Sequence, residues 1–185
     1  IIVAMLAKTL NELSGKRVLC MCPNKELTQQ NYDKFIAIGG KASIYSASIS
    51  KSMRYPVVFA TEQSFIKIAE KFKHEFCAII PDEAHKLTDT FLEIYRILKE
   101  GNPNLRVCGL TATPYQTGKG YIYELDEHNR TVLESNNPFY KKVVYRKEAD
   151  ELIDEGFLTP PLIGDVTDHY DTSGLSLKNG RFDEK

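Results

Sequence analysis

The sequence predicts an α/β protein with a doubly wound parallel sheet, and two observations lead to this class. Up to Pro114, short apolar runs that suit strands buried on both faces alternate with segments of helical periodicity. Glycine, proline or a capping residue marks most of the junctions between these segments. Buried strands that alternate with helices build a parallel sheet with helices on both of its faces.

The first elements are bounded by residues that end or begin helices. Residues 1–13 have apolar side chains at helical spacing, and Ser14-Gly15 ends that helix. Residues 17–22, RVLCMC, are almost continuously apolar, as in a strand covered on both faces. Pro23-Asn24 then opens a helix that two glycines end near residue 40.

The same alternation continues to Pro114. Thr61 directly follows an apolar run and is placed to cap the next helix, and Gly101 closes an amphipathic one. We therefore expect strands at 42–45, 57–60, 76–80 and 105–110, and helices at 61–72 and 89–100.

The pattern changes after Pro114. In residues 115–136, tyrosine and aliphatic residues alternate with polar ones around charged turns, which predicts a β-hairpin excursion. A strand at 141–145 and a short helix at 148–155 follow. The polar, turn-rich end of the chain predicts a linker, so we assign 1–166 to one domain and 167–185 to that linker.

Composition excludes some classes of protein. Lys plus Arg total 24 against 25 Asp plus Glu, so the global charge does not indicate a nucleic-acid or membrane partner. No apolar run approaches the roughly 20 residues that span a bilayer. The four cysteines lie in apolar runs, which favours reduced core thiols in a cytoplasmic protein.

Three polar stretches come directly after predicted strands. They are Pro23–Gln30, Pro81–His85 and Thr111–Pro114. In open parallel sheets, ligands bind beyond the carboxyl ends of the strands, so these stretches are expected to meet at one site.

The adjacent carboxylates Asp82 and Glu83 can be interpreted in two ways. The first residue can hold Mg²⁺, a cation that takes oxygen ligands and keeps several waters, while the second accepts a proton from an attacking water. A bare Asp-Glu pair more often only caps a strand–helix junction. The string DEAH at 82–85, after the apolar run FCAII, favours the catalytic interpretation.

The order of these stretches resembles the superfamily 2 helicases of DEAD/DEAH type. Residues 80–85 (IPDEAH) resemble their motif II and residues 109–114 (GLTATP) their motif III. Residues 23–27 with Gln30 resemble motif Ia, and residues 60–63 resemble motif Ib. Residues 109–123, 150–161 and the tail from 170 are similar to the bacterial RadD-like branch, which is implicated in DNA repair.

This resemblance implies a RecA-like domain 1 of the P-loop NTPase class, with ATP and Mg²⁺ as cofactors. Asp82 would position Mg²⁺ through water and Glu83 would activate the hydrolytic water. His85 would contact Thr111 or Thr113 and couple the nucleotide site to nucleic acid. The expected nucleic-acid contacts are Pro23, Asn24, Lys25, Gln30, Thr61 and Glu62.

Helix starts can bind phosphate, which gives the expected nucleic-acid contacts a physical basis, but some of these residues also have a simpler structural explanation. Backbone N–H groups at a helix start attract a phosphate, and Lys25 would assist. Such contacts to a strand's backbone are independent of base sequence. Plain helix capping explains Thr61 equally well, and strand-end turn chemistry explains Thr111 and Thr113. Pro81 departs from the aliphatic residue that usually precedes the acidic pair.

The sequence contains no G-x-x-x-x-G-K-[ST] phosphate loop. We expect that loop immediately before Ile1 and a second RecA-like domain after the linker, so that the isolated fragment would be inactive. The expected partners are that second domain and nucleic acid, DNA favoured over RNA. The alternatives are a non-catalytic nucleic-acid-binding or interaction module, an RNA helicase, and a Mg²⁺-dependent hydrolase unrelated to nucleic acid.

Overall fold

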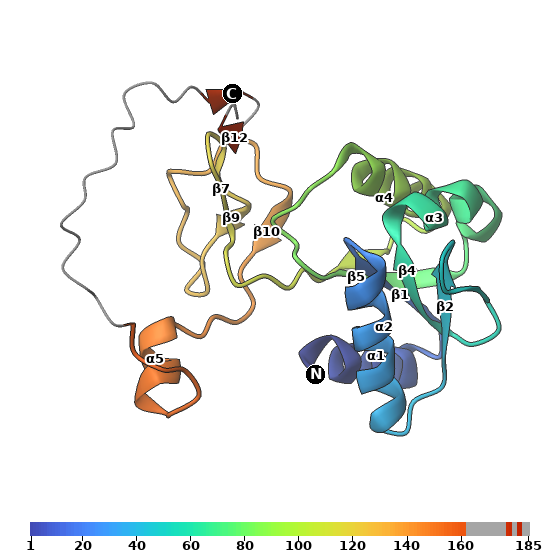
Figure 1. Ribbon diagram of the computed structural model, residues 1–185. Helices are drawn as coiled ribbons and strands as arrows, with labels where there is room; N and C mark the ends of the chain where they lie inside the picture. Colours follow the sequence, from blue (N-terminus) through green and yellow to red (C-terminus); the bar gives the residue numbers. More distant parts are fainter. Residues whose placement is uncertain (162–176, 179–180, 183–185) are drawn as a thin grey trace. The chain divides into compact units, whose positions relative to one another are not determined.

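A computed structural model of the chain describes residues 1–161, 177–178 and 181–182, and it divides into two compact units, Ile1–Thr113 and Pro114–Lys185 (Figure 1). The first unit contains the predicted parallel sheet. Its strands lie in the order β3-β2-β4-β1-β5-β6, and all neighbours are parallel except β2 and β3. The strands are β1 (Arg17–Cys22), β2 (Ala42–Ser46), β3 (Ser50–Lys51), β4 (Val57–Thr61), β5 (Phe76–Pro81) and β6 (Arg106–Val107).

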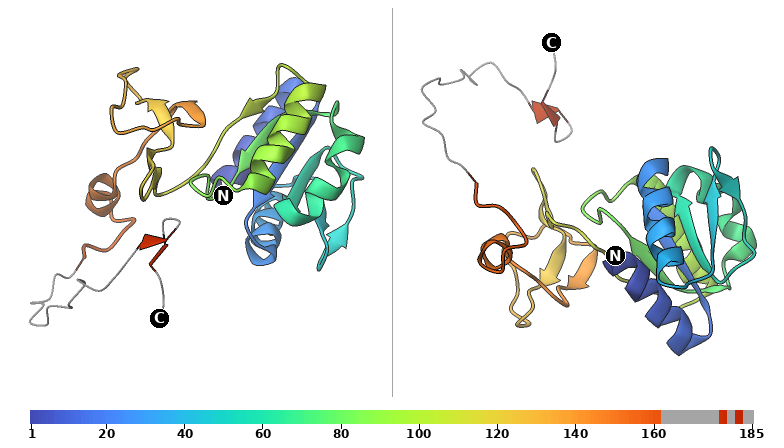
Figure 2. Two further views of the ribbon diagram at one scale, coloured as in Figure 1. Left: turned by 90° about the horizontal axis from the view of Figure 1, so that it is seen from above. Right: turned by 60° about the horizontal axis from the view of Figure 1, so that its bottom comes forward.

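Helices cover both faces of this sheet, as a doubly wound fold requires (Figure 2). On one face lie α1 (Ile2–Ser14) and α2 (Lys25–Ala37), which pack on β1 and its neighbours. On the other lie α3 (Glu62–Phe65), the 3₁₀ helix η1 (Ile66–Phe72) and α4 (Asp89–Gly101). The predicted α/β class is confirmed.

The alternation of side chains along β1 builds a core on each face of the sheet. Val18 and Cys20 pack in one cluster with Ala7 of α1 and Phe35 of α2. Leu19 and Met21, one residue out of phase, face the opposite side and are equally buried. This two-sided burial explains the continuous apolar run that the sequence shows at 17–22.

Two predicted elements are shorter or more irregular than expected. The helix predicted at 61–72 is one α-helical turn followed by 3₁₀ geometry. The strand predicted at 105–110 pairs regularly with β5 only at 106–107, although the Cys108 and Leu110 N–H groups still bond to the Ile79 and Pro81 carbonyls at 3.0 Å. The strand is also at the sheet edge, so most of it is only half-buried.

Pro81 explains the early end of regular pairing. In a parallel strand, the N–H and C=O of one residue point to the same neighbour. The Pro81 carbonyl bonds to Leu110 on the β6 side, so its imide nitrogen faces that side too, where it has no hydrogen to donate. The ladder toward β1 is intact, because the Asp82 N–H donates to the Met21 carbonyl at 2.8 Å.

The second unit begins with the predicted hairpin. Strands β7 (Tyr115–Gln116) and β8 (Gly120–Tyr121) pair in antiparallel register, which confirms the excursion. Gly120 has a positive φ of 85°, and a Cβ there would lie 1.7 Å from the Glu134 carbonyl oxygen, so this position requires glycine.

The remaining elements of this unit are small. They are β9 (Tyr123–Leu125), β10 (Tyr140–Lys142), α5 (Ala149–Asp154), β11 (Leu177–Lys178) and β12 (Arg181–Phe182). The strand predicted at 141–145 is thus shorter, and it pairs in parallel with β9. Apart from β11 and β12, the predicted linker at 167–185 lies outside the described residues.

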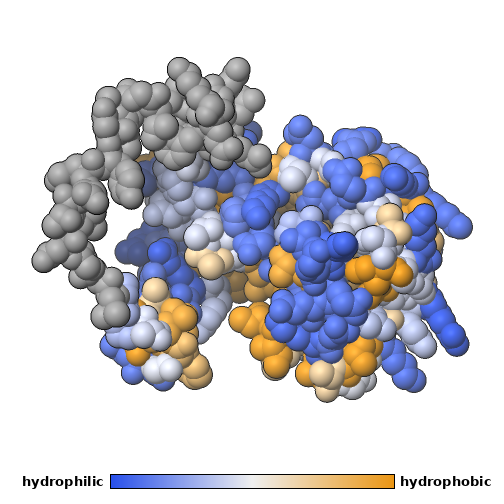
Figure 3. Space-filling model, in the orientation of Figure 1, coloured by the Kyte–Doolittle hydropathy of each residue, from blue (hydrophilic) through white to orange (hydrophobic). Residues whose placement is uncertain are grey.

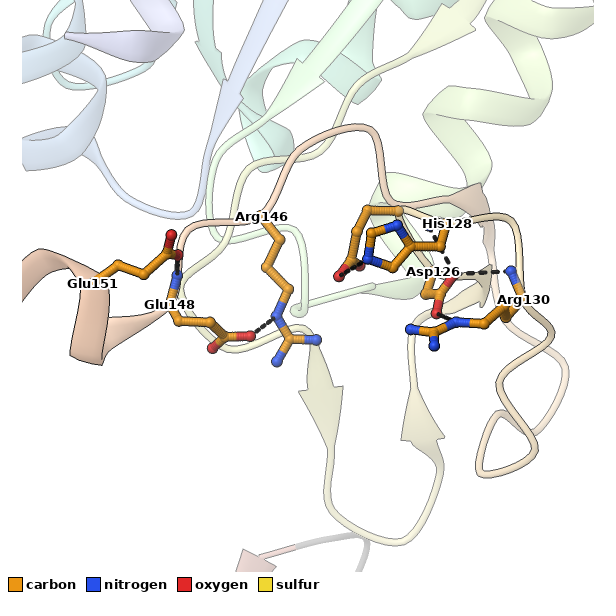
Figure 4. A network of polar contacts seen from close by, with 7 residues as sticks. Asp126, His128, Arg130, Arg146, Glu148 and Glu151 are labelled. Atoms are coloured by element: carbon orange, nitrogen blue, oxygen red, sulfur yellow. Dashed lines mark hydrogen bonds and ion pairs between the residues drawn. The ribbon is translucent and has the colours of Figure 1, made fainter.

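Polar contacts hold the turns of the second unit (Figure 4). Asp126 accepts hydrogen bonds from the backbone N–H groups of Arg130 and His128 at 2.8 and 2.9 Å and from the Arg130 guanidinium at 2.7 Å. These bonds, the backbone one from Arg130 foremost, lower the pKa of Asp126. Before α5, Arg146 pairs with Glu148 at 2.5 Å, and the Glu148 N–H donates to Glu151 at 2.8 Å.

The burial of the cysteines gives a first prediction. Burial places the pKa of Cys20 well above its ordinary value and raises that of Cys22 to about 11, so about one Cys22 thiol in a thousand is ionised at pH 8. In the folded chain, iodoacetamide at pH 8 should modify the half-exposed Cys77 and Cys108 first and leave Cys20 and Cys22 intact.

Mass spectrometry of peptides from native and urea-unfolded protein measures this order. All four thiols should react once the chain is unfolded. Modification of Cys20 or Cys22 at the rate of Cys108 in native protein would contradict the packing described for β1.

Candidate nucleotide and nucleic-acid site

The carboxyl ends of β1, β4 and β5 border a cavity of about 180 Å³. Five predicted site residues from three separate stretches of sequence line it: Pro23, Thr61, Glu62, Asp82 and Glu83. The parallel register causes this meeting, because it pairs Cys22 with Thr61 on one side of β1 and Met21 with Pro81 on the other.

Asp82 directly follows β5 and is held by both backbone and side-chain hydrogen bonds. Its N–H bonds to Met21 of β1, so its backbone continues the sheet. Its Oδ2 accepts a hydrogen bond from the Asn31 side-chain amide at 2.7 Å, and its Oδ1 accepts one from the Glu83 N–H at 3.1 Å. The carboxylate is therefore oriented by two donors, one on α2 and one from the next residue in the sequence.

Asn31 was not among the predicted site residues. It lies on α2 and is 5% exposed. The available signal is its place in the helix, because Thr28, Asn31 and Phe35 fall on one buried face at spacings of three and four residues. A polar amide within such a face indicates a buried partner, but the pattern does not show which residue that partner is.

Glu83 turns the chain away from the strand direction. Its φ is +55°, in the left-handed region that non-glycine residues seldom adopt. The bend leaves the Glu83 side chain 39% exposed and places its Oε2 3.4 Å from His85 Nδ1. Strained backbone of this kind often occurs at functional sites.

His85 lies against the stretch that follows β6. Its Nδ1 is 2.8 Å from the Thr111 hydroxyl and 3.4 Å from the Thr113 hydroxyl. The Thr111 hydroxyl also accepts the Thr113 N–H at 3.0 Å. Because a threonine hydroxyl both donates and accepts, it can pair with either tautomer of the imidazole. The structure thus brings together the three residues expected to couple the site.

The start of α2 is a capped helix end that lies beside an open depression. The Asn24 side chain caps the helix by accepting the Leu27 N–H at 2.8 Å. Lys25 and Gln30 instead face an open depression that Ser48 and Ile49, in the turn between β2 and β3, also line. The surface over α2 is hydrophilic (Figure 3).

Thr61 and Glu62 make contacts that the sequence did not indicate. Thr61 does not cap α3 with its side chain; its hydroxyl donates to the Ser64 hydroxyl at 2.9 Å. Glu62 accepts a hydrogen bond from the Thr88 hydroxyl, which also accepts the Phe91 N–H at 3.0 Å and so caps α4. Burial raises the pKa of Glu62, and the bond from Thr88 partly offsets that rise.

Comparison with known proteins shows the family. Residues 1–116 match the family described as the type III restriction enzyme, res subunit. The chain belongs to this family. No curated protein matches the chain.

Among solved structures, the chain is similar to the UvsW helicase from bacteriophage T4. The likeness has 25% identity and a TM-score of 0.51, and it covers 60% of this chain and 42% of the helicase. A second T4 UvsW structure aligns with 24% identity and a TM-score of 0.46 over 60% of this chain and 24% of its own. The family match and the first of these two structures show that the chain has a superfamily 2 helicase RecA-like domain. The chain spans less than half the length of the helicases that it matches.

Metal chemistry at this site depends on few groups. Among the described residues, no cluster of three or more His, Cys, Asp or Glu side chains is arranged to hold a metal ion. Each Asp82 oxygen has one hydrogen-bond donor, which leaves a lone pair on each. A Mg²⁺ ion that keeps most of its waters and takes phosphate oxygens fits a single carboxylate of this kind.

One further observation concerns membranes. Within the part of the chain that the structure describes, no helix is long and apolar enough to cross a bilayer.

The cap on α2 can be tested by stability. Asn24→Ala removes the acceptor for the Leu27 N–H and should lower the free energy of unfolding by about 1 kcal/mol. Gln30→Ala, exposed on the same helix, should change it by less than about 0.5 kcal/mol. Urea denaturation of both variants measures the difference, and equal effects would show that the Asn24 bond does not stabilise α2.

The half-buried Glu62 gives a pH dependence. Its folded-state pKa is raised, so the folded chain holds this proton more tightly than the unfolded chain does. The stability that the folded state gains from this tighter proton binding is complete below the ordinary pKa of about 4.5. It is lost as pH rises through the folded-state pKa. Glu62→Gln keeps an acceptor for Thr88 but cannot ionise, so it should gain stability relative to wild type between pH 4 and pH 7.

Denaturant unfolding of both proteins at several pH values measures this gain. A stability difference that stays constant or reverses with pH would contradict the assignment of a raised pKa to Glu62.

Proposed function

We propose that this chain is the first RecA-like domain of an ATP-dependent nucleic-acid helicase or translocase of DEAD/DEAH type. The observation that supports this most directly is the arrangement around motif II. Asp82 and Glu83 face a cavity at the strand ends, and His85 contacts both threonines of the Thr111–Pro114 stretch. A Mg²⁺-dependent hydrolase unrelated to nucleic acid would not need the contact between His85 and these threonines.

In this proposal each side chain has a separate task. Asp82 would hold the waters of a Mg²⁺ ion, and Glu83 would accept the proton of the water that attacks the terminal phosphate of ATP. Bound Mg²⁺ would offset the negative charge of the phosphates. The two carboxylates have different neighbours, because Asp82 Oδ2 bonds to Asn31 while Glu83 Oε2 lies 3.4 Å from His85 Nδ1, so one could bind metal waters while the other meets the attacking water.

His85 then links hydrolysis to the rest of the domain. Glu83 and Thr111 both lie within 3.4 Å of His85 Nδ1, so a change in the charge or position of Glu83 alters what the imidazole bonds to. We assign a coupling role to His85, Thr111 and Thr113 on this basis.

Nucleic acid would bind along the same edge of the sheet. The Asn24 side chain is occupied by capping, so the contacts at the start of α2 would come from the backbone N–H groups of Asn24 and Lys25 and from the Lys25 ammonium, with Gln30 one turn further on. Pro23 has no N–H to donate and would contribute only its ring. Thr61 and Glu62 would extend this surface. We favour DNA over RNA because residues 109–123 and 150–161 are similar to the RadD-like DNA-repair branch.

This function concerns a longer polypeptide. Residues 1–166 would form the first domain, and 167–185 would lead to a second RecA-like domain that completes the ATP site. All four cysteines are free thiols, and two of them are buried, which suits a cytoplasmic enzyme.

Glu83→Gln tests the catalytic assignment in the full-length protein. The amide keeps the shape of the side chain but cannot accept the proton, so ATP hydrolysis should fall at least about 100-fold. ATP affinity should stay within about twofold, because Glu83 is not assigned to binding. Glu93→Gln, an exposed carboxyl on α4, is the matched control and should leave turnover unchanged.

Steady-state ATPase rates and fluorescent-nucleotide titration measure the two quantities. Turnover by Glu83→Gln at the wild-type rate would refute the base assignment. A wild-type protein that binds DNA but hydrolyses no ATP would support a non-catalytic binding module instead.

A further inference from the structure

Asn31 is a buried polar residue that has no role in the proposed reaction. It is 5% exposed on the inner face of α2, between Thr28 and Phe35. A buried side-chain amide costs free energy unless it is hydrogen-bonded, so its partners explain its position.

Those partners lie at the end of the sheet. Asn31 Nδ2 donates to Asp82 Oδ2 at 2.7 Å and also lies 3.4 Å from the Cys22 sulfur. The bond to Asp82 joins two residues that are 51 positions apart in the sequence. A bond from a neutral donor to a carboxylate is shorter and stronger than one between two neutral groups.

Asn31 is also the only distant donor that we find on this carboxylate among the described residues. The other oxygen accepts the N–H of Glu83, its neighbour in sequence. A single local bond leaves the carboxylate free to rotate about its side-chain torsions. The second donor, from another element, fixes its plane.

We propose that Asn31 is a positioning residue that fixes the Asp82 carboxylate for metal binding. This inference rests on the proposed function, in which Asp82 holds the waters of Mg²⁺. Outer partners of this kind typically change metal affinity by about 10- to 100-fold when they are removed.

The hydrogen bond itself can be tested in the 185-residue chain without nucleotide. In ¹⁵N-labelled protein, the Asn31 side-chain NH₂ should exchange with solvent much more slowly than exposed amides such as that of Gln30. An Asn31 amide that exchanges as fast as Gln30 would overturn the assignment.

An exchange of the two side chains tests the pairing independently. Asn31→Asp places two carboxylates at hydrogen-bond distance and should destabilise the fold. Adding Asp82→Asn restores a donor–acceptor pair in reverse, so the double variant should regain most of the lost stability. A double variant at least as unstable as the sum of the single effects would show that the two residues are not partners.

Metal binding tests the positioning role in the full-length protein. Asn31→Leu keeps approximate volume but removes the donor to Asp82, so the Kd for Mn²⁺ in the presence of ATP should rise about tenfold by electron paramagnetic resonance. Thr28→Val is the matched control: it also removes a buried polar group of α2, one that bonds to the Asn24 carbonyl and not to Asp82. It should leave Mn²⁺ affinity unchanged.

The outcomes separate this inference from the proposed function. If Glu83→Gln abolishes hydrolysis but Asn31→Leu leaves the Mn²⁺ Kd unchanged, the positioning role is wrong and the helicase function stands. If Glu83→Gln retains turnover while Asn31→Leu weakens Mn²⁺ binding tenfold and Thr28→Val does not, the catalytic proposal is wrong and the positioning role stands.

Discussion

The parallel pairing of β1 with β4 and β5 is the constraint on which the site depends. It places Cys22 beside Thr61 and Met21 beside Pro81, so the residues that follow these strands emerge at one edge. A shift of register by one residue would turn the side chains of β5 to the opposite faces of the sheet and move Asp82 off the cavity. Two-sided burial of Val18–Cys22 makes such a shift costly, and the core thereby fixes the geometry of the acidic pair.

Pro81 also determines how the pairing of β5 with β6 ends at this edge. Its missing N–H ends regular pairing on the β6 side, while its carbonyl still accepts from Leu110. Beyond that point the Ala84 N–H bonds to the Leu110 carbonyl, which holds the turn at residues 82–85 against the stretch that contains Thr111. Pro81 is therefore compatible with the contact between His85 and Thr111, because the two segments stay joined by backbone hydrogen bonds on either side of it.

Different interactions stabilise the two compact units. The first has apolar side chains packed on both faces of a sheet, and nearly all of the matched region, residues 1–116, lies in it. In the second, the described residues include few buried apolar side chains, such as Ile122 and Tyr123, and its turns are held by Asp126 and by the bonds around Glu148. Turn chemistry of this kind is local, so the hairpin at 115–121 was predictable although strand lengths after it were not.

The sequence by itself determined the α/β class, the order of most elements and the stretches at the strand ends, because apolar periodicity and capping residues act over a few neighbours. It did not determine where polar side chains bond. Only the tertiary structure decided three hydrogen bonds: Asn31 to Asp82, Thr88 to Glu62, and the Thr61 hydroxyl to Ser64. The physical reason is that the first two of these contacts join residues 51 and 26 positions apart, which meet only after the sheet has formed. The third lies in the single α-helical turn after β4, where the Thr61 hydroxyl donates to the Ser64 hydroxyl and accepts no backbone N–H.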